Sequence, residues 1–296
     1  GAAFLVLHRG EGVIERYANG GGAETPTLNW SMGKSLLGTL IGRLEMMGEL
    51  KLDDPAPVDL WQSSAEDPRR NIRIIDLLRM SGGLACERNT PVWRRRTAVA
   101  DHDYIYSAPV NVLQHAINSP IARAPNERFN YSNCEMQALG YILKDKASKL
   151  GGYGAFPHRE LYNRIGMGGL VTEVDTYGNF HFTGYDYGTA RDWARYGLLY
   201  LNRGVWNGER LLSENFVEAA KTPGPVWRDG PGGQLGNHPL TYGATHWLNT
   251  GGRYHVPRDA FFPQGYSGNF AFIVPSEELV IVIDRPLSML GGRSTV

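Results

Sequence analysis

The sequence predicts an α+β fold (an α/β sandwich), in which an antiparallel sheet built from both ends of the chain is flanked by helices and carries a helical insertion. Two observations support this prediction: β-rich runs occupy residues 3–17 and 270–283, and helical periodicity dominates the long segment between them. We therefore expect two domains that are discontinuous in sequence. Residues 1–29 and 184–296 would form the α/β sheet domain, and residues 30–183 would form a mostly helical domain.

The chain begins with a predicted hairpin and continues into a predicted helix. The β-rich runs on either side of residues 9–12 indicate two paired strands. Apolar side chains recur at helical spacing over residues 30–48, with Asn29 as a suitable N-cap and Gly48 as a suitable C-cap. Ser31 would then lie in the first turn of this helix.

The remaining helices precede the completion of the sheet. Periodicity indicates helices at residues 74–80, 110–118, 133–147 and 190–202. Thr189 and Asp192 have the spacing of a capping box at the start of the last of these helices. Residues 222–263, rich in Gly, Pro, Asn and Trp, are expected to form long surface loops that could wall a cleft, and residues 270–274 and 279–283 a second hairpin.

Composition narrows the classes of function. The 296 residues include 30 basic and 30 acidic side chains, which argues against a nucleic-acid partner, and no apolar run approaches the roughly 20 residues that span a bilayer. Cys86 and Cys134 fit no zinc spacing, so they form either one disulfide or two buried thiols. The chain begins at Gly1 without an initiator Met, and we expect a periplasmic or extracytoplasmic location in preference to a cytoplasmic one.

Ser31 and Lys34 are candidates for a nucleophile and its base. Three residues apart on one helix, they lie on the same face, so the amine can reach the hydroxyl proton. The N–H of Ser31, in the first turn, has no intrahelical partner and could stabilise an oxyanion. Burial of Lys34 would favour the neutral amine that a base requires. The alternative is a surface lysine, since this spacing alone occurs by chance about once in a chain of this length.

Other catalytic and ligand-binding patterns are excluded. Residues 33–35 resemble the end of a phosphate-binding loop, but Leu28 stands where that motif requires Gly. Residues 265–269 resemble a nucleophile elbow, but Asn269 stands where its last Gly is required. The eight histidines show no metal-binding spacing, so a metal site is not expected. We expect no organic cofactor either.

Tyr131 is the candidate proton relay. A phenol held beside a cationic lysine has a stabilised phenolate form and can pass a proton to the leaving group. Asn133, which offers a donor and an acceptor, could position both Lys34 and a substrate carbonyl. The alternatives are a buried structural tyrosine and an asparagine that caps the following helix.

Three segments together carry a family resemblance. Ser31-Met32-Gly33-Lys34, Tyr131-Ser132-Asn133 and Gly265-Tyr266-Ser267-Gly268 occur in the order and rough spacing found in the class C β-lactamase and penicillin-binding-protein superfamily. Residues 75–84 and 125–133 also resemble this superfamily. Residues 190–195 resemble its subgroup of 6-aminohexanoate-dimer hydrolases and family VIII esterases.

The resemblance implies a β-lactamase/transpeptidase-like fold, with the active site in the crevice between the sheet and a helical domain. It assigns the roles of nucleophile (Ser31), base (Lys34), proton relay (Tyr131) and substrate contacts (Asn133, Tyr266, Ser267 and Gly268). It also implies that the third segment is an edge strand, and that the N–H groups of Ser31 and Asn269 form the oxyanion hole.

Tyr266 departs from the superfamily pattern, because Lys or His often stands at that position. The change removes a cation that would meet a substrate carboxylate, so neutral esters and amides are expected to be preferred over β-lactams. An arginine from elsewhere, such as Arg253, Arg258 or Arg285, could replace that cation.

The expected function is a serine hydrolase that cleaves an ester or amide of a small molecule through an acyl-Ser31 intermediate, of the carboxylesterase or amide-oligomer hydrolase type. Two alternatives stay open: a D,D-peptidase or weak β-lactamase, and a binding or sensor module that is acylated without turnover. The expected partner is the small-molecule substrate, with no nucleic acid and no membrane span.

Overall fold

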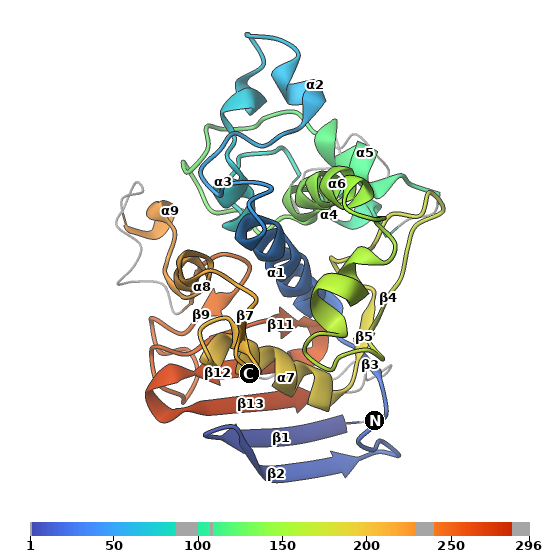
Figure 1. Cartoon of the computed structure of the whole chain (residues 1–296). Coiled ribbons are helices and arrows are strands. Elements are labelled where there is room, and N and C mark those ends of the chain that lie inside the picture. Colours follow the sequence, from blue (N-terminus) through green and yellow to red (C-terminus); the bar gives the residue numbers. More distant parts are fainter. Residues whose placement is uncertain (1, 87–99, 107–108, 229–239, 286–296) are drawn as a thin grey trace.

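The computed structural model describes residues 2–86, 100–106, 109–228 and 240–285. An eight-stranded antiparallel sheet lies at the bottom of Figure 1, in the order β2-β1-β13-β12-β10-β9-β8 with β11 paired to β12. Strands from the two ends of the chain, β1 and β13, therefore lie side by side in this sheet. This arrangement confirms the predicted fold class.

The two predicted hairpins lie next to each other and form one side of the sheet, with β2 at the edge. They are β1 (Ala2–His8) with β2 (Glu11–Ala18), and β12 (Asn269–Val274) with β13 (Leu279–Asp284). β1 pairs with β13 from Ala3↔Asp284 to His8↔Leu279, and β12 pairs with β13 from Phe270↔Ile283 to Val274↔Leu279. This register brings the end of β13 beside the start of β12, where the third predicted motif ends.

The rest of the sheet corrects the prediction for residues 222–263. This segment contains α9 (Pro225–Arg228) and the strands β8 (Thr241–Tyr242), β9 (Trp247–Leu248) and β10 (Phe261–Phe262), followed by β11 (Gln264–Gly265). Tyr242, Leu248 and Phe261 are buried in the core, so much of the segment is not surface loop. Strands of two residues are too short to show alternation, which explains why composition misled the prediction. Residues 229–239 lie outside the described part of the chain.

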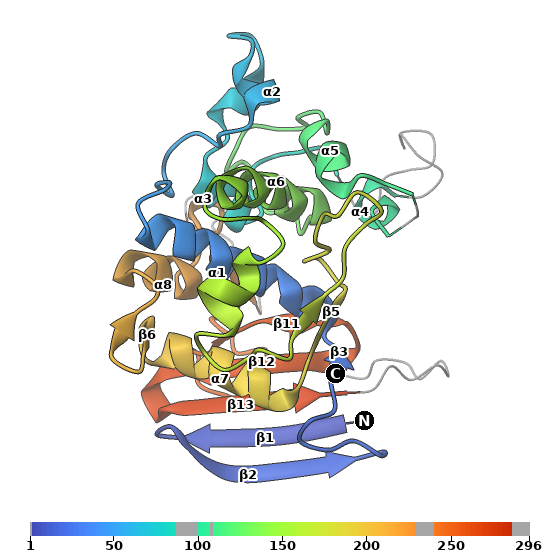
Figure 2. The same cartoon turned by 45° about the vertical axis from the view of Figure 1, so that its right-hand side comes forward.

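Helix α1 (Gly33–Met46) runs through the middle of the molecule. It lies between α6 (Asn133–Lys149) on one side and α7 (Ala190–Leu201) and α8 (Glu214–Lys221) on the other, with α7 covering the sheet (Figures 1 and 2). Every residue of α1 from Gly33 to Leu44 is buried. A helix packed on all sides needs no polar face, which accounts for its strongly apolar sequence.

The start of this helix differs in detail from the prediction. Residues Trp30–Met32 form a separate 3₁₀ turn, η1, and the α-helix begins only at Gly33. Asn29 precedes η1, but its side chain makes no capping hydrogen bond; its Oδ1 instead accepts from the N–H of Gly188 at 2.6 Å. Gly48, at a φ of +80°, follows the end of the helix as expected.

The remaining elements are short helices and strands. The α-helices are α2 (Asp59–Gln62), α3 (Ile74–Leu78), α4 (Asp101–Tyr104) and α5 (Val112–Ile117). The 3₁₀ turns are η2 (Pro68–Asn71) and η7 (Pro275–Glu277), and η4 (His158–Tyr162) is a π-helix. A small sheet joins β3 (Thr27–Leu28), β5 (Asp186–Gly188) and β4 (Val171–Thr172), and β6 (Val205–Trp206) pairs with β7 (Glu209–Arg210).

All four later helices predicted from periodicity are present, and the capping box of Thr189 and Asp192 is formed. The boundaries of the two expected domains stay a prediction. Among the described helices, none has the length and apolar character needed to cross a bilayer.

Candidate active site

Ser31 and Lys34 meet at the start of α1. Ser31 is half-buried in the turn η1, and Lys34 lies in the first turn of α1 with 1% of its surface exposed. The Nζ of Lys34 donates to Ser31 Oγ at 2.9 Å and to the carbonyl of Thr183 at 2.8 Å. The alternative of a surface lysine is therefore wrong, and the predicted contact between amine and hydroxyl is present.

Tyr131 brings the second segment to the same place. Its ring centroid lies 5.0 Å from Lys34 Nζ, and the ring stacks on Trp247 at 5.4 Å between centroids. Ser132 caps α6, because its Oγ accepts from the N–H of Glu135. A capped helix and an aromatic stack hold the phenol beside the amine.

Asn133 is the first residue of α6 and not its cap, which corrects that alternative. It is 1% exposed, and its Nδ2 donates to the hydroxyl of Tyr106 at 3.3 Å. The Tyr106 hydroxyl in turn donates to the Thr183 carbonyl at 2.9 Å, so this carbonyl binds both Lys34 and Tyr106. Burial raises the pKa of Tyr106, which keeps the phenol protonated as a donor.

The third segment is mostly a turn. Its first residue, Gly265, ends the short strand β11, and the expectation of an edge strand is wrong for the three residues that follow. Tyr266–Gly268 form the 3₁₀ turn η6 between β11 and β12. Ser267 and Gly268 have φ values of +67° and +84°, and two successive left-handed residues reverse the chain direction. The turn is fixed against the start of η1, because Gly265 packs so closely on the carbonyl of Asn29 that a Cβ would collide with it.

Asn269 ties this turn to its surroundings. Its Nδ2 donates to the Leu28 carbonyl at 3.1 Å, and its Oδ1 accepts from the N–H of Arg285 at 2.8 Å. The Arg285 side chain lies along the turn, with Nη1 3.5 Å from the position a Cβ would take at Gly268. Of the arginines considered, Arg285 lies beside the third segment, and Arg258 lies beside Gly252. The role of the Asn269 N–H in an oxyanion hole stays a prediction.

Asp186 is a buried carboxyl group that no sequence motif indicated. It lies on β5 against the first residue of α1, where a Cβ at Gly33 would collide with its carboxyl group and with the Phe182 carbonyl. Only glycine fits at position 33 for this reason. Burial raises the pKa of Asp186 well above its ordinary value, and the nearby Lys34 opposes that shift.

A disulfide holds the residue that directly follows the Tyr131-Ser132-Asn133 segment. Cys86 and Cys134 are bonded, which decides between the two states left open for them. Beside this bond, Glu135 accepts from the N–H groups of Gly82 and Gly83 at 3.1 and 3.0 Å. Burial raises the pKa of Glu135 to about 8. These contacts fix the start of α6 to the loop at residues 81–86.

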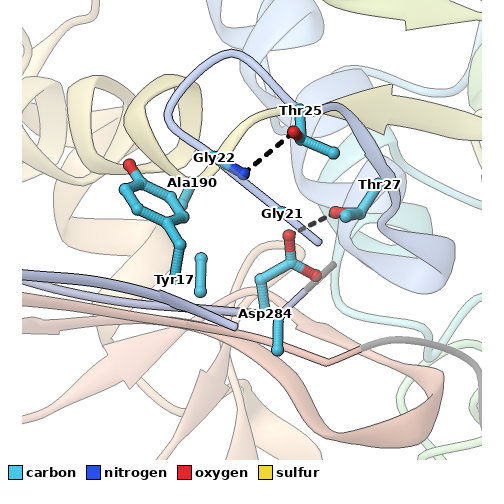
Figure 3. A pocket seen from close by; sticks show the side chains of 9 residues that line it. Tyr17, Gly21, Gly22, Thr25, Thr27, Ala190 and Asp284 are labelled. Carbon is cyan, nitrogen blue, oxygen red and sulfur yellow. Dashed lines mark hydrogen bonds between the residues drawn. The ribbon is translucent and has the colours of Figure 1, made fainter. Parts of the chain in front are cut away.

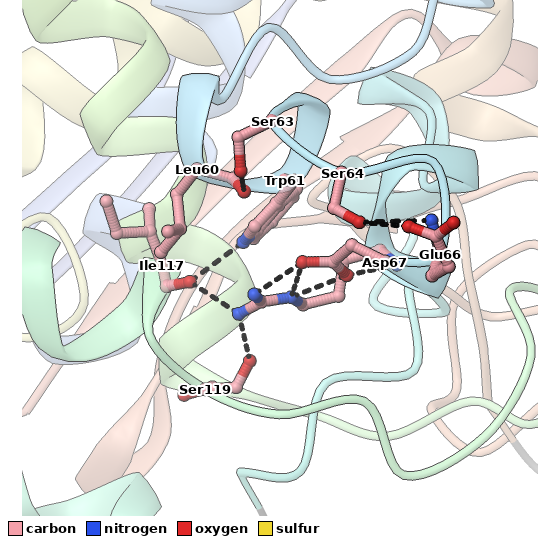
Figure 4. Close-up of polar contacts among 9 residues, drawn as sticks. Leu60, Trp61, Ser63, Ser64, Glu66, Asp67, Ile117 and Ser119 are labelled. Carbon is pink, nitrogen blue, oxygen red and sulfur yellow. Dashed lines mark hydrogen bonds and ion pairs between the residues drawn. The ribbon is translucent and has the colours of Figure 1, made fainter.

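Two hollows lie elsewhere on the molecule. One, of about 10 Å³, is lined by Tyr17, Thr27 and Asp284, and the Thr27 hydroxyl donates to the Asp284 carboxylate there (Figure 3). The other is an open hollow of about 550 Å³ lined in part by Asp67, whose carboxylate binds Arg69. Figure 4 shows Asp67 and the polar contacts around it. Neither hollow is lined by Ser31, Lys34 or Tyr131. Within the described ranges, no group of three His, Cys, Asp or Glu residues is placed to hold a metal ion.

The β-lactamase family model matches residues 1–283 of the chain. A candidate 6-aminohexanoate-dimer hydrolase from Bacillus anthracis has 24% sequence identity and a TM-score of 0.73, with 95% of this chain and 72% of that chain covered. A family VIII carboxylesterase has 16% identity and a TM-score of 0.73, with 99% and 89% covered.

An octameric penicillin-binding protein homologue from Pyrococcus abyssi has 17% identity and a TM-score of 0.68, with 97% of this chain and 69% of that chain covered. These likenesses show a β-lactamase/transpeptidase-like fold. No functionally curated sequence matches the chain.

Proposed function

This chain belongs to the β-lactamase family, and from that premise we propose that it cleaves an ester or amide bond of a small molecule through an acyl-Ser31 intermediate. The contact of 2.9 Å between Lys34 Nζ and Ser31 Oγ carries the proposal. A hydroxyl group is a weak nucleophile unless a base removes its proton, and this amine is within hydrogen-bond reach of it.

Acylation would begin with transfer of the Ser31 proton to a neutral Lys34 as Oγ attacks the substrate carbonyl. Burial of the amine supports its neutral form, because desolvation disfavours the charge. The Thr183 carbonyl accepts one N–H of Lys34, which orients the amine toward the hydroxyl. The proton would then pass by way of Tyr131 to the leaving alcohol or amine, and the ester of Ser31 would be hydrolysed by water.

The developing oxyanion needs two donors. The N–H of Ser31 lies in the first turn of η1, where N–H groups lack helical partners. We assign the second donor to the N–H of Asn269, which follows the turn packed against η1. Asn133 and the η6 residues Tyr266, Ser267 and Gly268 would contact the substrate beside these donors.

The names of the structural neighbours support an ester or amide as the substrate, since they include a carboxylesterase and a candidate amide-dimer hydrolase. Tyr266, a neutral residue, favours uncharged substrates. The Cys86–Cys134 disulfide supports an oxidising compartment such as the periplasm.

One observation favours a second candidate function. Arg285 places a guanidinium beside Gly268, where it could bind the carboxylate of a β-lactam or of a peptide terminus. A weak β-lactamase or D,D-peptidase therefore stays a competing proposal. An acylated module without turnover would instead show a burst of product with no steady state.

The test is labelling and turnover of the whole chain with 4-nitrophenyl esters, a linear amide dimer and nitrocefin. We expect steady-state hydrolysis of at least one of these, and a single acyl adduct on Ser31 by intact and peptide mass spectrometry. Ser31→Ala should abolish both signals, and Ser81→Ala, a buried serine in a structural loop, is the matched control. An adduct that persists in the Ser31→Ala protein would refute the assignment.

A further inference from the structure

Aromatic rings cover the surface beside the nucleophile. We call Trp30, Tyr106, Tyr185 and Tyr266 the aromatic surface. The Trp30 ring lies 5.8 Å from Tyr266 and 6.3 Å from Tyr185, and Tyr185 lies 5.2 Å from Tyr106, measured between centroids. Tyr266 is 69% exposed and the other three residues are half-buried, so all four are partly accessible in the described part of the chain.

The position of Trp30 is held at a cost in backbone energy. Its φ of +56° is left-handed, a conformation that is strained for a bulky residue. Both flanks are anchored: the N–H of Asn29 donates to the Asp186 carbonyl at 2.9 Å, and Ser31 binds Lys34. Strain of this kind persists where the surroundings fix it and is concentrated at functional sites.

The aromatic surface is connected directly to the reaction centre. Trp30 precedes Ser31 in the same turn η1. At the other end, the Tyr106 hydroxyl donates to the Thr183 carbonyl that also binds Lys34. A substrate whose carbonyl reaches Ser31 would therefore have a neighbouring group over these rings.

We propose that the aromatic surface binds a planar aromatic group of the substrate, on its acyl or its alcohol side. Aromatic rings prefer edge-to-face or offset contacts with one another, and gain from them beyond the area that they bury. A flat ring fits a face of tilted rings better than a puckered alkyl ring of equal size. A cationic group, the other ligand of aromatic clusters, is disfavoured because the guanidinium of Arg285 lies beside the Tyr266 turn.

This inference rests on the proposed function and specifies its substrate class. The test compares esters that differ only in the ring. Ethyl phenylacetate against ethyl cyclohexylacetate tests the acyl side, and benzyl acetate against cyclohexylmethyl acetate tests the alcohol side, with acid release followed by titration at constant pH. Acetylcholine against 3,3-dimethylbutyl acetate tests for a cation.

In the wild type we expect kcat/KM for the aromatic ester to exceed that for its cyclohexyl partner by about two- to tenfold on at least one side. Tyr266→Leu and Tyr185→Leu should each bring that ratio close to one. The matched control is Tyr177→Leu, since Tyr177 is 56% exposed and lies outside the aromatic surface. It should leave the ratio unchanged.

Binding provides a readout that does not depend on turnover. Calorimetry on the Ser31→Ala protein should show the same preference for benzyl acetate over cyclohexylmethyl acetate, and Tyr266→Leu in that background should remove it. The inference would be overturned by any of three results: ratios near one on both the acyl and the alcohol side, an aromatic preference that Tyr266→Leu leaves intact, or a preference for acetylcholine over 3,3-dimethylbutyl acetate. Failure of the proposed function would look different: no hydrolysis dependent on Ser31 for any ester, whatever the binding ratio.

Discussion

Lys34 donates a 2.9 Å hydrogen bond to Ser31, and the bond joins the first turn of α1 to the preceding turn η1. The second N–H of the amine is fixed on the Thr183 carbonyl at 2.8 Å. The two heavy atoms are already within proton-transfer distance, so a neutral Lys34 could take the hydroxyl proton once the hydrogen bond between them reverses, with Ser31 as the donor.

Lys34→Ala should cost nearly as much as Ser31→Ala, because a nucleophile and its base act as a unit. We expect kcat to fall by on the order of a thousandfold or more, with the fold retained by circular dichroism. Lys149→Ala, at an exposed ion pair with Asp145, is the matched control and should keep wild-type kcat. A Lys34→Ala enzyme with more than a tenth of the wild-type rate would show that the base lies elsewhere.

Tyr131→Phe tests the relay without changing the stack on Trp247. The ring and its buried area are kept, so the melting temperature should change little, while kcat should fall by roughly a hundredfold, as for a lost proton-transfer group. Tyr177→Phe, which makes the same change at an exposed tyrosine, is the control and should keep wild-type kcat. If Tyr131→Phe turns over at the wild-type rate, the tyrosine serves only packing.

The contacts among Ser31, Lys34 and Tyr131 were predictable because local spacing and a family resemblance encode them. A spacing of three residues in a helix fixes the first pair whatever the rest of the fold does. The hairpins at the two ends were predictable for a similar reason, since each shows its own β-rich runs around a turn.

Other parts of the site leave no such signal. The Thr183 group that binds Lys34 is a backbone carbonyl, which any residue supplies. Asp186 meets Gly33 only through the pairing of β3 with β5, a long-range contact that local patterns do not contain. The segment at Tyr266 was expected as a strand, but the left-handed backbone of Ser267 and Gly268 makes it a turn.

Removal of the disulfide should destabilise the protein. Cys86 and Cys134 are 48 residues apart, and loop-closure entropy for that separation predicts a loss of about 2 to 4 kcal/mol in the free energy of unfolding. The measurement is urea unfolding of Cys86→Ser/Cys134→Ser against the wild type. Reductant should lower the wild-type midpoint and leave the double variant unchanged; equal midpoints without reductant would contradict a stabilising role.

Asp284 should make stability depend on pH. Burial raises its pKa to about 6, although the Thr27 hydroxyl opposes the shift. The folded state then binds this proton more tightly than the unfolded chain, so the contribution of Asp284 to the unfolding free energy falls as pH rises from about 4 to about 6 and is constant above that. The loss is on the order of 2 to 3 kcal/mol.

Asp284→Asn removes this titration and keeps an acceptor for Thr27. The difference in unfolding free energy, variant minus wild type, should therefore rise between pH 4 and pH 7. The rise should equal the stability that the wild type loses as Asp284 deprotonates. Urea unfolding at four pH values measures the difference, with Asp54→Asn as an exposed control. A difference that stays constant across this range would rule out titration of Asp284.

Arg285 tests whether the chain accepts substrates that carry a carboxylate. Its guanidinium lies beside Gly268, and only its backbone N–H binds Asn269, so Arg285→Ala removes the charge without breaking that contact. Because the side chain is exposed, we expect kcat/KM for nitrocefin to fall by about tenfold, the lower end of the range for a charge-assisted hydrogen bond. A neutral ester should be cleaved as before, and Arg258→Ala should change neither rate. If Arg285→Ala lowers both rates equally, the arginine supports the turn and does not select the substrate. The cation would then be missing from the wild type, and Tyr266→Lys, which supplies one, should gain activity toward nitrocefin.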